Sequence, residues 1–429
     1  MSTNVQARKR RIDEEPRFII GMDAHSRKLA ISIWDWSDRF NPVLHREYKC
    51  VGIDDLATTY KRHMDLDSIT IIEASTNSTM LKNRLNELGF RAEVVRADLI
   101  ADKERKRKVC DIQDARNLAR AYIKGDVDEF VWTPSDAYAE YKDILFAYRD
   151  ANKELVRCSN RIWSICSRKG YPLPIRSKVT KAVAVRSMIN DLDITGFIRE
   201  RLEILIEEYE SHMRTSDRLR KIIAEIVLQN PKMLKLMQLT GINFRAAFAI
   251  QTATEDATRF PSSSKFKAYC GFAPIADSSG EEEEKAKRKG GLQKPLDGEG
   301  RRDLKTFLAE AGQTVMHKCP KSSLGRWGWR RVNAGKHKNK VVCAIGGKLS
   351  TYAWHIMRGD PTPNRESEAL FRRKMLQFYS EIGKSRMHEL GYTCSRTEFS
   401  ETVARSFYGH LPPIQEEASD GEDRRGDPA

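Results

Sequence analysis

The first third of the chain alternates between short apolar runs and longer amphipathic stretches. The apolar runs are rich in β-branched and aromatic residues, which predicts buried strands. The predicted strands lie at residues 17–23, 29–36, 45–51, 68–74 and 91–97, and the third of these runs, HREYKCV, is largely polar. Helical patterns precede and follow the fourth run, and another follows the fifth. Three strands followed by alternating helices and strands predict a mixed sheet flanked by helices.

The same order of elements occurs in the ribonuclease-H-like fold. We therefore predict an α/β domain of this fold over residues 17–135, after a disordered segment at residues 1–16. In such a sheet the first and fourth strands are neighbours. The acids that end these two strands, Asp23 and Glu73, are therefore expected to lie close together.

From Tyr138 onward, apolar residues recur three and four positions apart. Two such runs, near residues 138–166 and 198–228, are separated by a break at residues 170–174 (GYPLP). They predict two long helices that form an antiparallel hairpin or coiled coil over residues 136–230. A helical spacer between domains and a device for self-association are both compatible with this pattern.

A compact all-α domain is predicted for residues 231–360. Its first two helices are joined by a tight turn around Gly241, an arrangement that resembles a helix-hairpin-helix. Such a turn can hold a phosphate on backbone N–H groups, although a plain helical hairpin is the alternative. Residues 361–429 form a C-terminal extension whose acidic tail is expected to be disordered.

The composition adds a class of partner to this picture. The chain has 429 residues, 40% of them hydrophobic, and its net charge of +15 suits a polyanion, most often nucleic acid. Its cysteines have no zinc-like spacing and indicate reduced thiols of a cytosolic protein. We expect no signal peptide and no membrane span, because the basic N-terminus is not followed by an apolar segment and no run of ~20 apolar residues occurs.

Four acids are placed where they could form a metal site. Asp23 and Glu73 end predicted strands, and Asp111 and Asp114 lie three positions apart on one face of a predicted helix. Carboxylates that converge without partners repel one another, and Mg²⁺, which prefers oxygen ligands, would remove that repulsion. Two ions ~3.5–4 Å apart would clamp the attacking and leaving oxygens of a phosphodiester. Each acid alone also has an ordinary interpretation, and Asp111 would then be the N-cap of a solvated helix start.

Two basic segments are predicted to contact phosphates. One directly precedes Asp111, and the other interleaves its basic residues with Trp327 and Trp329. These tryptophans could stack on unpaired bases or pack into the core. The predicted nucleic-acid-binding residues are Lys103, Arg105, Lys106, Arg107, Arg330, Arg331, Lys336 and Lys338.

Five blocks of the sequence resemble, in order, the DEDD-type insertion-sequence transposases, which are recombinases guided by a bridge RNA. The resemblance covers most of residues 17–357. The blocks are IIGMDAHSRKLAISIWD, IIEASTNSTMLKNRLNELGFRAEVVRA, KVCDIQDARNLARAY, TGINFRAAFAIQTATEDATRFPSSSKFKAYCGFAPIADSSG and GEGRRDLKTFLAEA. Five ordered blocks are more specific than one short motif.

The resemblance implies a RuvC-like nuclease domain in which the metal-binding tetrad would be Asp23, Glu73, Asp111 and Asp114. It also implies a helical domain whose nucleophilic serine matches the serine before glycine in DSSG, Ser279. That serine would attack a DNA phosphodiester and form a transient phosphoserine link. The implied reaction is the cutting and rejoining of donor and target DNA.

The same resemblance implies partners and a location. A structured guide RNA would supply the base pairing, and the protein would act as a homo-oligomer, either a dimer or a tetramer, in a prokaryotic cytoplasm, associated with the nucleoid. The sequence departs from the family directly after DSSG. There, glutamates at positions 281–284 stand where the family usually has basic residues.

Three functions follow from these observations. An RNA-guided DNA recombinase requires Ser279, whereas a junction-resolving endonuclease would use only the four acids and a metal-activated water. A non-catalytic nucleic-acid-binding protein would tolerate Asp23→Ala and Glu73→Ala. Of these three functions we favour the recombinase. We interpret His25, which lies beside the end of the first predicted strand, as a turn residue.

Overall fold

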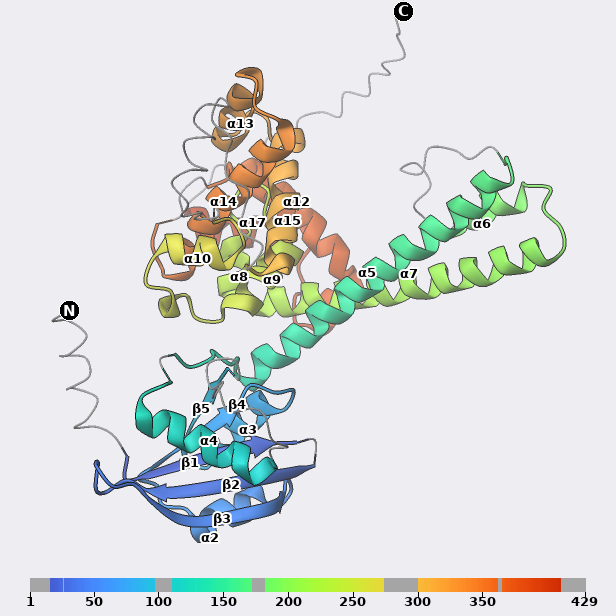
Figure 1. Cartoon of the computed structure of the whole chain (residues 1–429). Coiled ribbons are helices and arrows are strands. Elements are labelled where there is room, and N and C mark those ends of the chain that lie inside the picture. The colour runs from blue at the N-terminus through green and yellow to red at the C-terminus, as the bar shows by residue number, and fades with distance from the viewer. Residues whose placement is uncertain are drawn as a thin grey trace, which may run out of the picture. The chain divides into compact units, whose positions relative to one another are not determined.

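A computed structural model of the chain describes most of its length. The described residues are 16–25, 27–96, 110–127, 129–171, 182–273, 300–361 and 365–409. The chain divides into two compact units, residues 1–140 and 141–429 (Figure 1). No described helix is both long enough and apolar enough to cross a membrane.

The five predicted strands are confirmed, and they form one mixed sheet in the first unit. The strands are β1 (Phe18–Ala24), β2 (Lys28–Asp35), β3 (Val43–Gly52), β4 (Ser68–Glu73) and β5 (Arg91–Val95). Their order in the sheet is β3-β2-β1-β4-β5. The pairs β1–β2 and β2–β3 are antiparallel, while β1–β4 and β4–β5 are parallel. The first and fourth strands are therefore neighbours, as predicted.

Helices cover both faces of this sheet (Figure 1). The face that carries Met22 and Ile72 packs against α2 (Leu56–His63) and α3 (Ser78–Glu87). The opposite face packs against α4 (Asp111–Lys124). Central strands that are covered on both sides bury nearly all of their side chains, which explains why β1 and β4 are mostly apolar in the sequence.

Most of a long helical hairpin belongs to the second unit, and its first helix begins just before the boundary between the units. The two long helices predicted from the apolar spacing are present as α5 (Asp136–Arg168) and α7 (Phe197–Gln229), each 33 residues long. A shorter helix, α6 (Ala182–Asn190), packs with them around a shared apolar cluster that includes Ile162 and Leu202 (Figure 1). This cluster stabilises the distal part of the hairpin.

The remaining described helices of the second unit share one large core. It includes Phe248, Leu308, Ile345, Phe371 and Phe399. The helices are α8 (Pro231–Leu236), α9 (Phe244–Thr254), α10 (Ser263–Tyr269), α12 (Arg302–Lys318), α13 (Ser323–Asn333), α14 (Lys338–Met357), α15 (Glu368–Ile382), α16 (Lys384–Glu389) and α17 (Arg396–Tyr408), with the 3₁₀ turn η3 (Ala257–Arg259). The last three helices lie beyond residue 361, yet their apolar faces belong to the same core.

The turn between α8 and α9 does not have the exposure that a phosphate-binding turn needs. Gly241 has a φ of 87°, and a Cβ added to it would lie 2.6 Å from the Ala311 carbonyl oxygen of α12. The neighbouring residue Ile242 is fully buried. At the start of α9 the Asn243 side chain already accepts a hydrogen bond from the Ala246 N–H. Of the two alternatives left open by the sequence, the structure therefore favours the plain helical hairpin over a phosphate-binding turn.

Candidate metal site

The sheet brings two of the predicted acids to the same edge. The parallel pairing of β1 with β4 ends at Met22 and Ile72, so Asp23 and Glu73, the next residues, end neighbouring strands. Both lie one position beyond residues that face α2 and α3, so both project to the face covered by α4. Asp23 is only 8% exposed, whereas Glu73 is partly exposed.

Helix α4 carries the other two acids, and a glycine lets its backbone approach the sheet. A Cβ added to Gly21 of β1 would lie 1.8 Å from the carbonyl oxygen of Ala115, so only glycine fits beneath the helix. The helix presents Ala115 and Ala119 among the residues that it buries. This close packing fixes the first turn of α4, which contains Asp111 and Asp114, beside the end of β1.

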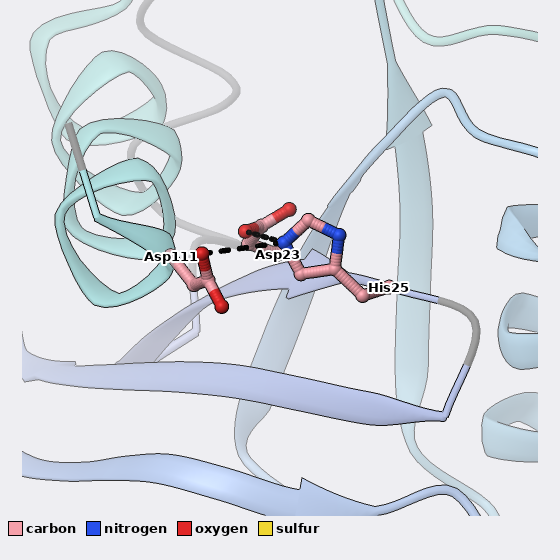
Figure 2. A group of neighbouring side chains, drawn as sticks. All are labelled: Asp23, His25 and Asp111. Atoms are coloured by element: carbon pink, nitrogen blue, oxygen red, sulfur yellow. Dashed lines mark ion pairs between the residues drawn. The ribbon is translucent and has the colours of Figure 1, made fainter. Parts of the chain in front are cut away.

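Asp111 is the first residue of α4 and not its N-cap. The N-cap is Cys110, whose backbone carbonyl accepts hydrogen bonds from the N–H groups of Gln113 and Asp114. The Cys110 side chain itself makes no capping hydrogen bond. The Asp111 side chain is 60% exposed, and its carboxylate points toward the strand end, as Figure 2 shows. The capping interpretation of Asp111 is therefore wrong.

A histidine completes the group. The Nε2 atom of His25 lies 3.3 Å from Asp23 Oδ2 and 3.3 Å from Asp111 Oδ1 (Figure 2). The backbone of His25 is held in place, because its N–H donates to the Lys28 carbonyl at 3.1 Å and its carbonyl accepts from Asn77 Nδ2 at 3.0 Å. Among the described residues, Asp23, His25 and Asp111 offer ligand atoms that all lie within 4.8 Å of one another.

The electrostatics of this group favour a cation. Burial raises the pKa of the Asp23 carboxyl above its ordinary value, and the charge of His25 opposes this effect. The nearby carboxylates of Asp114 and Asp111 raise the pKa further. A buried carboxylate next to two others is unfavourable by itself, and a divalent cation would relieve both its desolvation and the repulsion.

The donor set fits a divalent ion. Carboxylate oxygens suit Mg²⁺, and the imidazole nitrogen of His25 also suits Mn²⁺ and other transition metals. Of the four predicted ligands, Asp23 and Asp111 belong to the three-residue group. Asp114 is near enough to change the pKa of Asp23, and Glu73 ends the adjacent strand. His25 was missed by sequence reasoning, although its position two residues after Asp23 in an extended segment indicates a shared face.

The predicted phosphate-binding residues of the second unit lie on and after α13. Arg330, Arg331 and Lys336 are exposed, and Lys338, which begins α14, is partly exposed. Both interleaved tryptophans pack against the core of the unit, which is the alternative expected for them. The predicted contacts at Lys103, Arg105, Lys106 and Arg107, and the candidate nucleophile Ser279, lie outside the described residues.

Comparison with known proteins gives one family. Residues 233–324 match the model of the transposase IS116/IS110/IS902 family. The match lies in the second unit and begins within α8, so it does not include the carboxylate group of the first unit. No curated protein matches the chain. The family match supports an insertion-sequence transposase, and a protein of this class binds DNA.

Proposed function

We propose that this insertion-sequence transposase cleaves and rejoins DNA strands at a metal-dependent, RuvC-like carboxylate site in its first unit. The observation that carries the proposal is the meeting of Asp23, His25 and Asp111 at the end of β1. A structural ion pair would not need two acids around one histidine, with a third acid, Asp114, close enough to raise the pKa of Asp23.

Each residue has a separate task in this proposal. Asp23 is held by a buried strand and would be the most rigid metal ligand, while Asp111 would bind from the helix. Glu73 and Asp114 would supply further oxygens, which gives enough donors for two Mg²⁺ ions. The imidazole nitrogen of His25, which lies within 4.8 Å of the same carboxylate oxygens, would be a further ligand for a transition metal such as Mn²⁺. A bound divalent ion would supply charge stabilisation for the scissile phosphate and its leaving oxygen.

The nucleophile in this proposal is the hydroxyl of Ser279, which lies inside the residues matched by the family model. Its oxygen would form a bond to the DNA phosphorus while the bond from phosphorus to one deoxyribose oxygen breaks, and that oxygen would leave as a hydroxyl. Attack by the hydroxyl of a second strand would then restore the serine and join the strands. A structured guide RNA would select the sites by base pairing. Because two DNA molecules are joined, at least two copies of the chain would act together, as a dimer or a tetramer.

The metal-dependent step is tested with Asp23→Asn. This variant should lose DNA strand cleavage in the presence of Mg²⁺ or Mn²⁺ and should still bind DNA, because the substitution preserves shape and removes one ligand charge. The matched control is Asp126→Asn, an exposed acid just beyond the other end of α4. Cleavage at the wild-type rate by the Asp23→Asn protein would show that the carboxylate group has another role.

The serine step is tested by trapping covalent protein–DNA adducts. Ser279→Ala should abolish the adducts, whereas Ser278→Ala, the same change one position away, should reduce them little or not at all. If Ser279→Ala still cleaves DNA while no adduct forms in either protein, water is the nucleophile. The chain would then be a junction-resolving endonuclease of the kind that uses only the carboxylate group.

A further inference from the structure

One long segment of the second unit contains basic residues and no acidic ones. Between Ala311 and Gly359 there is neither aspartate nor glutamate. The lysines and arginines of the segment are Lys318, Lys321, Arg326, Arg330, Arg331, Lys336, Lys338, Lys340, Lys348 and Arg358. Within the described part of the chain, none of these lysines and arginines forms an ion pair with an aspartate or a glutamate. Positive charge that the fold does not neutralise is available to a polyanion.

A pocket lies on the α13 side of this segment. It has a volume of about 580 Å³ and is lined by Pro320, Ser323, Arg326, Trp329, Arg330 and Asn333. Most of these residues lie three or four positions apart on α13, so one face of a single helix forms most of the pocket. The volume falls within the range of small-molecule sites, roughly 300–1,000 Å³.

The helix that carries this pocket is packed rigidly. A Cβ added to Gly325 would lie 2.3 Å from the Cys319 carbonyl oxygen, and one added to Gly328 would lie 2.4 Å from the Met316 sulfur. The indole N–H of Trp329 donates to the Met316 carbonyl at 3.0 Å, which fixes the orientation of the ring. The pocket therefore has a preorganised aromatic wall next to two cationic side chains.

We propose that this pocket binds one unpaired nucleotide of a nucleic-acid strand. The base would lie against Trp329, the guanidinium groups of Arg326 and Arg330 would bind the flanking phosphates, and the Asn333 amide would face a base or sugar edge. Base stacking on an aromatic side chain and contacts with the phosphate backbone are the usual means of binding single strands. A duplex hides the faces of its bases, so it could use the arginines but not the aromatic wall.

The inference rests on the proposed function only for the class of partner, nucleic acid, and it needs no catalysis. Its test is therefore a binding measurement in EDTA, in which the carboxylate group has no part. Fluorescence anisotropy would compare single-stranded DNA, single-stranded RNA of the same sequence and the corresponding duplexes. The test variant is Arg326→Gln/Arg330→Gln. The matched control is Arg214→Gln/Arg218→Gln, two exposed arginines with the same spacing on α7.

We expect the parent protein to bind single strands more tightly than duplexes. The test variant should bind single strands at least about tenfold more weakly, and the slope of log affinity against log salt should fall by about 1.4, or about 0.7 for each lost phosphate contact. The control should stay within about twofold of the parent. A preference for RNA would assign the pocket to a guide strand and a preference for DNA to an opened substrate strand, and either supports the proposal.

The aromatic wall has its own readout. Addition of a single strand should quench tryptophan fluorescence in the parent protein, and most of this change should be absent in Trp329→Phe. A circular dichroism spectrum like that of the parent would show that this variant is folded. The proposal is overturned if duplexes bind as tightly as single strands, or if the test variant and the control bind single strands equally.

Discussion

The close approach of α4 to the sheet predicts a large effect for a very small substitution, Gly21→Ala. The added methyl group would lie 1.8 Å from the carbonyl oxygen of Ala115 and 2.9 Å from the backbone nitrogen of Ala119. Neither is the mobile end of a side chain, so the helix must move. To restore the 3.4 Å of ordinary contact, it must withdraw by about 1.6 Å.

This displacement has two measurable consequences. Overpacking of this kind destabilises a fold by about 1–3 kcal/mol, and a clash with a helix backbone belongs at the upper end. The displacement also separates Asp111 from Asp23 and His25, whose ligand atoms now lie within 4.8 Å of one another. We therefore expect faster hydrogen exchange in α4 and at least about a tenfold loss of Mn²⁺ affinity, the effect typical when the support of a metal ligand is removed.

The matched control is Gly52→Ala, in β3 of the same sheet. There the nearest atom to an added methyl group is the carboxylate end of Asp55, at 2.9 Å, which can rotate away. This variant should change stability by no more than about 0.5 kcal/mol and should bind Mn²⁺ normally. Isothermal titration and hydrogen-exchange mass spectrometry would measure both proteins. If Gly21→Ala matched Gly52→Ala in both measurements, the packing of α4 on Gly21 would not position the carboxylate group.

Three further predictions concern single groups. His25→Ala should weaken Mn²⁺ binding by about tenfold and Mg²⁺ binding much less, because imidazole is the better ligand for the transition metal; equal losses would exclude direct ligation. Since the pKa of Asp23 is raised in the folded state, the metal-free first unit should lose stability as the pH rises from the ordinary aspartate pKa to the raised one. Thermal unfolding of Asp23→Asn should not show this loss. If the pH profile of the variant matched that of the parent, the pKa of Asp23 would not be the cause. Lys374→Met should destabilise the second unit by about 3–5 kcal/mol, because Lys374 donates to the Met237 carbonyl at 2.7 Å and pairs with the buried Glu366. Urea unfolding would measure this loss, and adding Glu366→Gln should recover part of it.

The sequence was a good guide to the sheet because each strand carries a local signal. Apolar runs located four of the strands, while β3 is largely polar and exposed, and the order of the elements implied that β1 and β4 are neighbours, which placed Asp23 and Glu73 at one edge. The position of α4 is a long-range property that its own residues do not show. A signal was nevertheless present, because Gly21 interrupts a buried strand, and an isolated glycine there commonly marks a close backbone approach.

Two features of the second unit were not determined from the sequence, and both have physical causes. The turn at Gly241 has the composition of an exposed turn, and only the packing of α12 against it shows that it is buried. The segment after residue 361 was predicted as an extension, but Phe371, Met375, Phe378 and Ile382 recur at helical spacing and fill the core. The helical spacing of these apolar residues therefore indicated that the segment packs into the core. The acidic composition of the tail that follows obscured this signal.

Net charge alone is a weak indication of a nucleic-acid partner, because the chain has 75 basic and 60 acidic residues and many of them pair. Arg186, for example, lies between Glu203 and Glu210, and Arg386 between Glu225 and Glu389. Such pairs cancel within the fold and contribute little field at a distance. A polyanion is attracted by the basic side chains that have no acidic partner. Long stretches of sequence without aspartate or glutamate identify such side chains directly. In this chain such a stretch leads to α13 and to the pocket beside Trp329.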